Sequence, residues 1–98
     1  MDFATFEALA AHASESVLAF AAFAASSEDI ALGAEENHAR LHYERSWFEL
    51  EIVNATALTE WEADGCPADW IEKWTQRFRQ DAVETSGLLT DAARALLL

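Results

Sequence analysis

The sequence contains very few of the residues that mark several common protein classes. Its 98 residues include one cysteine, one proline, three glycines and only six Lys or Arg against 18 Asp or Glu, so the net charge is −12. The single cysteine, Cys66, excludes an internal disulfide framework and indicates a reducing, cytoplasmic location. The shortage of basic residues argues against direct binding to nucleic acid or to an anionic membrane surface, because both repel an acidic chain.

The sequence also lacks a long hydrophobic run and the alternating pattern of a β-strand. Its most apolar stretch, residues 17–25, is far shorter than the roughly 20 residues that cross a bilayer. Acids and no bases precede this stretch, which is the wrong charge for a secretory signal. Because β-branched residues are scattered and never alternate, we predict an all-α protein that does not interact with membranes.

The apolar fraction is sufficient for one compact domain. Hydrophobic residues make up 52% of the chain, which argues against disorder despite the net charge. A chain of this length buries about two-thirds of its unfolded surface in a single core. We therefore predict one all-helical domain over residues 1–98, a small bundle of three main helices plus a short C-terminal helix.

Apolar residues recur every three or four positions along most of the chain. This spacing predicts three main helices, over residues 3–25, 34–64 and 67–85. Gly65 is a typical residue after a helix C-terminus, and Pro67 suits the first turn of the next helix. Ser86 and Gly87 are predicted to end the third helix and to precede the short C-terminal one. The conformation of residues 26–33 is left open between a helical turn and a loop.

The predicted central helix carries two apolar stripes when its residues are placed at 100° intervals. One stripe contains Tyr43, Trp47, Leu50, Asn54, Ala57 and Trp61. The opposite stripe contains Leu41, Phe48 and Ile52. We expect the aromatic stripe to form the domain's own core. The second stripe is then a candidate interface with another chain, most simply a second copy in a homodimer.

Acidic residues fill the two flanks between these stripes. One flank carries Glu44, Glu51 and Glu62. The other flank carries Glu35, Glu49 and Glu60. Residues 28–64 hold ten acids and two arginines, a net charge of −8 within the total of −12. A general need for solubility would not predict this concentration, although a purely solubilising role stays open as the alternative.

Glu35, His38 and His42 form the one pattern that suggests a metal. On a helix, two histidines four residues apart can reach one divalent ion, and Glu35 could add a carboxylate ligand. Iron or manganese would need further ligands from a second helix. The glutamate of the HExxH zinc motif is absent. The alternative is a solvated flank on which acids favour the charged histidines, and no other cofactor is indicated.

Catalytic patterns are otherwise missing, since no histidine lies near Cys66 in the sequence and no glycine-rich phosphate loop exists. We therefore predict a non-enzymatic, acidic protein-binding module. In its most concrete form it is an inhibitor or adaptor whose acidic flanks mimic nucleic acid and engage the basic surface of a partner protein. The alternatives are a metal-binding helical bundle and a purely structural assembly subunit.

Overall fold

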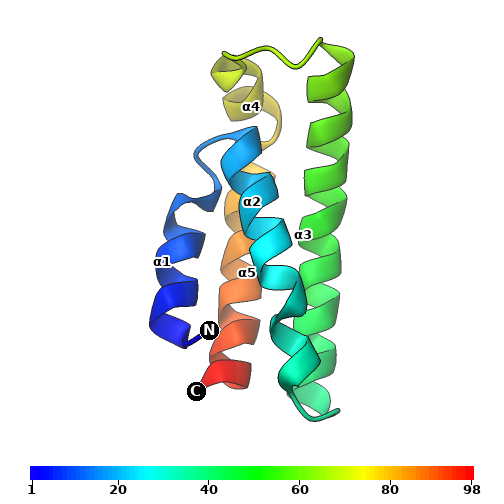
Figure 1. Cartoon of the computed structure of the whole chain (residues 1–98). Coiled ribbons are helices and arrows are strands. Elements are labelled where there is room, and N and C mark those ends of the chain that lie inside the picture. The colour runs from blue at the N-terminus through cyan, green and yellow to red at the C-terminus, as the bar shows by residue number, and fades with distance from the viewer.

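The computed structural model describes all residues 1–98 and contains only helices and their connections (Figure 1). The helices are α1 (Phe3–Ala13), α2 (Val17–Glu28), the 3-10 helix η1 (Asp29–Gly33), α3 (His38–Ala63), α4 (Ile71–Arg77) and α5 (Arg79–Leu97). This confirms the predicted small all-α bundle. None of these helices combines the length and apolar character that a membrane crossing requires.

Four helices alternate in direction and form the bundle, as Figure 1 shows. α1 packs against α2 and α5, and α3 packs against the same two helices, so the four form a closed ring. The short helix α4 lies at the end of the bundle where the chain passes from α3 to α5. The result is an elongated molecule, 41 × 21 × 18 Å, whose length is set by α3.

The predicted first helix, residues 3–25, is in fact two helices. The chain turns at residues 14–16, and the Ser16 hydroxyl caps α2 by accepting a hydrogen bond from the Ala19 amide at 3.1 Å. Serine favours such a cap because its hydroxyl satisfies a free amide of the first turn. The turn folds α2 back on α1 and places the Phe6 and Phe23 rings 5.4 Å apart. The prediction failed because the apolar spacing continues through the turn.

The predicted third helix, residues 67–85, is also wrong at both ends. Pro67 lies in the connection before α4, and the helical path bends at Phe78 between α4 and α5. α5 then continues through Ser86 and Gly87 to Leu97, so no separate C-terminal helix exists. A glycine inside a helix costs only about 1 kcal/mol relative to alanine, which the buried apolar face of α5 outweighs.

The Gly87→Ala substitution is expected to stabilise the protein by about 1 kcal/mol. A β-carbon at this exposed position would meet no heavy atom within 4 Å. The melting temperature, followed by far-UV circular dichroism, should rise by about 4–8 °C. The matched control is Gly65→Ala, which should destabilise because Gly65 has a φ of +90°. An unchanged or lower melting temperature for Gly87→Ala would contradict an unstrained helical position.

The aromatic stripe of the central helix forms the core of the bundle, as predicted. Tyr43, Leu50 and Ala57 are fully buried, and the stripe's two tryptophans pack at its margin. The Tyr43 hydroxyl donates to the Ser27 carbonyl at 2.6 Å, and Trp47 Nε1 donates to a second α2 carbonyl, that of Ala24. These two hydrogen bonds fix α3 against α2 and leave its opposite side facing outward.

Candidate functional site

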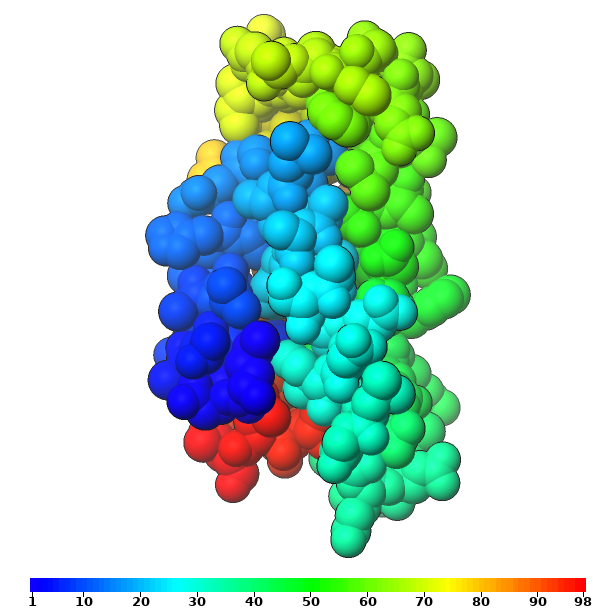
Figure 2. All heavy atoms as spheres, in the orientation of Figure 1, coloured from blue at the N-terminus to red at the C-terminus, as the bar shows by residue number.

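The opposite stripe of α3 is an exposed apolar surface. Leu41, Phe48 and Ile52 are 50%, 62% and 53% exposed, and we refer to these three residues as the outer stripe. α3 forms one long edge of the molecule in Figure 2. Several large apolar side chains exposed on one helix face are typical of a surface that contacts another molecule.

A shallow depression lies on this face. It has a volume of about 350 Å³ and is lined by Leu41, Glu44, Arg45, Phe48 and Glu49. The exposed Arg45 makes no ion pair within the chain. The depression therefore combines apolar contact area with charges of both signs.

Three of the six predicted acidic residues have partners within the chain. Glu44 accepts from Arg40 Nε at 2.9 Å, and Glu51 accepts from Asn54 Nδ2 at 3.2 Å. Glu60 pairs with Arg77 of α4 at 2.7 Å and is partly buried. Glu60 thus belongs to the contact between α3 and α4, which its position on the predicted flank did not reveal.

The other three acidic residues remain exposed. Glu49 and Glu62 lie on α3, and Glu35 lies in the connection that precedes it. None of the three takes part in a side-chain ion pair within the chain. These three, which we call the free carboxylates, are the part of the predicted flanks that is available to a partner.

The structure does not bring the three predicted metal ligands together. The central helix begins at His38 with Asn37 as its cap, so Glu35 lies outside the helical register that the prediction assumed. His38 and His42 are both exposed. No group of three or more His, Cys, Asp or Glu side chains is placed to hold a metal ion. The helix keeps the four-residue spacing of His38 and His42 but does not include Glu35, because it begins at residue 38 and not at residue 34.

Asp64 organises the connection between α3 and α4, a role the sequence did not predict. Its Oδ2 atom accepts hydrogen bonds from Lys73 Nζ and Trp70 Nε1, both at 2.8 Å. These hydrogen bonds, that of Lys73 first, lower the pKa of Asp64 below its usual value. The carboxylate thus orients the chain as it leaves α3, which is a structural role.

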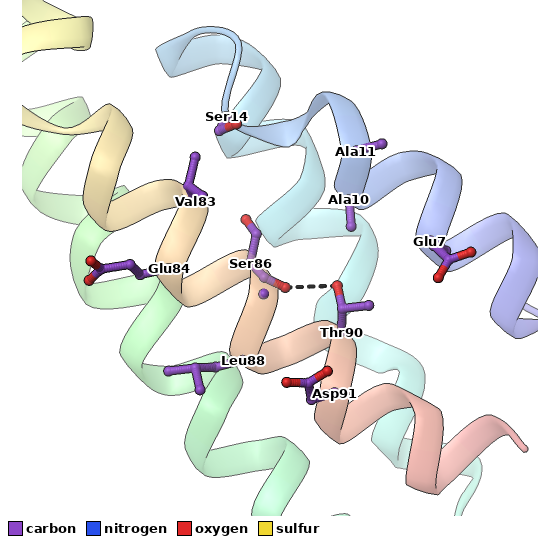
Figure 3. Close-up of a pocket in the computed structure, with 11 residues that line it drawn as sticks. Glu7, Ala10, Ala11, Ser14, Val83, Glu84, Ser86, Leu88, Thr90 and Asp91 are labelled. Atoms are coloured by element: carbon purple, nitrogen blue, oxygen red, sulfur yellow. Dashed lines mark hydrogen bonds between the residues drawn. The ribbon is translucent and has the colours of Figure 1, made fainter.

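A second surface feature is a groove between α1 and α5 (Figure 3). It has a volume of about 800 Å³. The residues that line it are Glu7, Ala10, Ala11, Ser14, Val83, Glu84, Ser86, Gly87, Leu88, Thr90 and Asp91. Three of them are acidic and none is Lys or Arg, so the groove attracts cations. The sequence did not reveal this α1–α5 groove. Its α1 wall was predicted to be part of one long helix over residues 3–25, and Ser86 and Gly87 of its α5 wall were predicted to end a helix.

Comparisons of the chain with protein-family models, with curated proteins and with solved structures find no match. The function of the chain is therefore inferred from the chemistry of these two surfaces.

Proposed function

We propose that the protein is a non-enzymatic binding module, an inhibitor or adaptor, whose α3 surface engages a basic surface of a partner protein. The observation that supports this most directly is the outer stripe, an exposed apolar line on a helix that also carries free carboxylates. Apolar contact supplies affinity, while the carboxylates select a basic partner and accelerate the encounter.

The length of α3 favours a partner that normally holds nucleic acid. Its 26 residues extend for about 39 Å, and Glu49 and Glu62 lie about 20 Å apart along its axis. Such a rod carries negative charge at intervals along its length, as a nucleic-acid backbone does, with Glu49 on one flank of the outer stripe and Glu62 on the other. A groove lined with Lys and Arg would offer α3 the same positive potential that it offers the phosphates of a nucleic acid.

The test compares the protein with the triple variant Glu35→Gln, Glu49→Gln and Glu62→Gln. Partners are captured from lysate of the native host at low and at high salt, purified, and titrated against both proteins. We expect the triple variant to bind at least about tenfold more weakly. Each substitution removes the attraction between one carboxylate and the basic surface of the partner, an attraction that salt screens only in part. We also expect wild-type affinity to fall steeply with salt.

A matched control removes three exposed acids elsewhere, through Glu15→Gln, Glu28→Gln and Glu72→Gln. This variant has the same net charge as the first and should retain nearly all of the affinity. Equal weakening by both variants, or a wild-type affinity that is independent of salt, would refute the proposed role of α3.

A homodimer through the outer stripe is the second candidate. Arg45 favours it, because this unpaired cation lies beside Glu49 in the same depression and could pair with Glu49 of another copy. Two chains of charge −12 repel each other, so added salt would strengthen a homodimer but weaken the complex with a basic partner. Molar mass measured by light scattering at two salt concentrations distinguishes the two.

A further inference from the structure

We propose that the α1–α5 groove binds a basic amphipathic helix of a partner protein. This docking site is separate from the α3 surface, because none of its lining residues belongs to α3. It does not depend on the function proposed for α3. If both sites operate, the protein is an adaptor that joins two partners.

The charges of the groove define the chemistry of its occupant. Glu84 and Asp91 are seven residues apart on α5, which places them on one face and about 10.5 Å apart along the axis. Glu7 of α1 lies toward the same end of the groove as Asp91, and Glu84 lies toward the other end (Figure 3). Two basic side chains seven residues apart on a helix have the matching separation.

The carboxylates are available to such a ligand. Glu7 has no side-chain partner within the chain, and Asp91 is 3.6 Å from Arg94 in an exposed pair. Glu84 accepts a single hydrogen bond from Gln80 at 3.2 Å. Exposed contacts of this kind contribute little stability, so a ligand cation can replace them at small cost.

The shape of the groove indicates a helix as its occupant. Small residues, Ala10 and Ala11 on α1 and Gly87 on α5, line the two walls, and a β-carbon at Gly87 would meet open space. Val83 and Leu88 add exposed apolar area. Small-molecule sites enclose most of their ligand, whereas this groove is open along two helices (Figure 3). A third helix can pack its ridge of side chains between them.

Ser86 forms part of the floor of the groove. Its side chain lines the groove but is only 5% exposed, and its hydroxyl has no hydrogen-bond partner. The hydroxyl oxygen is itself buried beneath the groove surface, so a ligand would contact the exposed rim carboxylates and not this oxygen. A lysine ammonium, with three donors and no acceptor, can donate to a rim carboxylate of the groove.

The test uses a fluorescent synthetic peptide of about 18 residues, long enough to form a helix, with alanine and leucine around two lysines spaced seven apart. Fluorescence anisotropy measures its affinity for the full chain. We expect the double variant Glu84→Gln and Asp91→Asn to weaken binding by at least about tenfold. Gly87→Leu should weaken it similarly by filling the groove, while circular dichroism stays unchanged.

Two controls separate helix recognition from simple charge attraction. The variant Glu49→Gln and Glu62→Gln has the same net charge as the double variant but leaves the groove intact, so it should bind the peptide within about twofold of wild type. A peptide of equal charge with a central proline cannot form the helix and should bind poorly.

Several outcomes would overturn the proposal. These are equal weakening by the α3 variant, equal binding of the proline peptide, and displacement of the peptide by spermidine at equal concentration. Each would show attraction to cations without recognition of a helix. Failure here would leave the α3 proposal intact, because the groove and the α3 surface consist of different residues.

Discussion

Trp74→Ala is expected to lower the free energy of unfolding by about 3–5 kcal/mol. The side chain is fully buried, and its ring centre lies 5.7 Å from that of Phe20 and 6.1 Å from that of Phe78. Its Nε1 also donates to the Ser14 carbonyl at 2.9 Å. The substitution therefore creates a cavity and removes the hydrogen bond that joins α4 to the α1–α2 turn. Small domains are stable by only about 5–15 kcal/mol, so the loss is a large share of the total.

Urea denaturation followed by far-UV circular dichroism measures this effect without relying on tryptophan fluorescence. Trp74→Phe serves as the matched control, because it keeps an aromatic ring but loses the Nε1 donor and should cost less than the alanine variant. Ile71→Ala changes a half-exposed residue of the same helix and should alter stability by no more than about 1 kcal/mol. A loss below about 1 kcal/mol for Trp74→Ala would contradict its place at the centre of the core.

We expect the protein to lose stability above pH of about 10, because the buried Tyr43 ionises more easily in the unfolded chain than in the folded one. Its side chain is 1% exposed, and burial raises the pKa of Tyr43 well above its usual value, outweighing the opposite effect of the hydrogen bond to Ser27. When folding raises the pKa of a group, that group contributes its full stabilisation of the folded state at any pH below its pKa in the unfolded chain. That stability is lost as the pH rises through the interval between the unfolded and folded values.

Tyr43 is the only tyrosine, so tyrosinate absorbance reports on this residue alone. We expect this absorbance to appear together with the loss of helical circular dichroism. The control is Tyr43→Phe, which should be about 1–2 kcal/mol less stable at neutral pH but should lose less additional stability above pH of about 10. Tyrosinate formation near pH 10 in a protein that remains folded would contradict the buried environment.

The sequence predicted those features that depend on local pattern. The spacing of Tyr43, Leu50 and Ala57 identified the buried face of α3, and the same reasoning identified the outer stripe. Gly65 has the positive φ that suits the residue after a helix end. Helical periodicity and cap chemistry act over a few residues, which is why one sequence was enough.

Features that depend on contacts between distant segments were not predictable. The turn at residues 14–16 interrupts an apolar pattern that is equally compatible with one long helix, and α5 retains Gly87 because its other face is buried. Glu60 was counted as a free acid because its partner, Arg77, lies 17 positions further along the chain. The α1–α5 groove was not predicted for the same reasons. Its two walls exist only because α1 ends before the turn at residues 14–16 and because α5 continues through Gly87.

The closed ring of helices implies an order of assembly. The helices of the pairs α1–α2 and α2–α3 are adjacent in the chain, so their contacts form by closing short loops. The contact between α1 and α5 instead brings together the two ends of the chain and closes the longest loop. Both termini accordingly lie at the same end of the molecule (Figure 1). The contact between α1 and α5 is thus the most non-local in the fold. A partner that recognises both walls at once would bind the finished molecule and ignore a nascent chain or one from which either end has come loose.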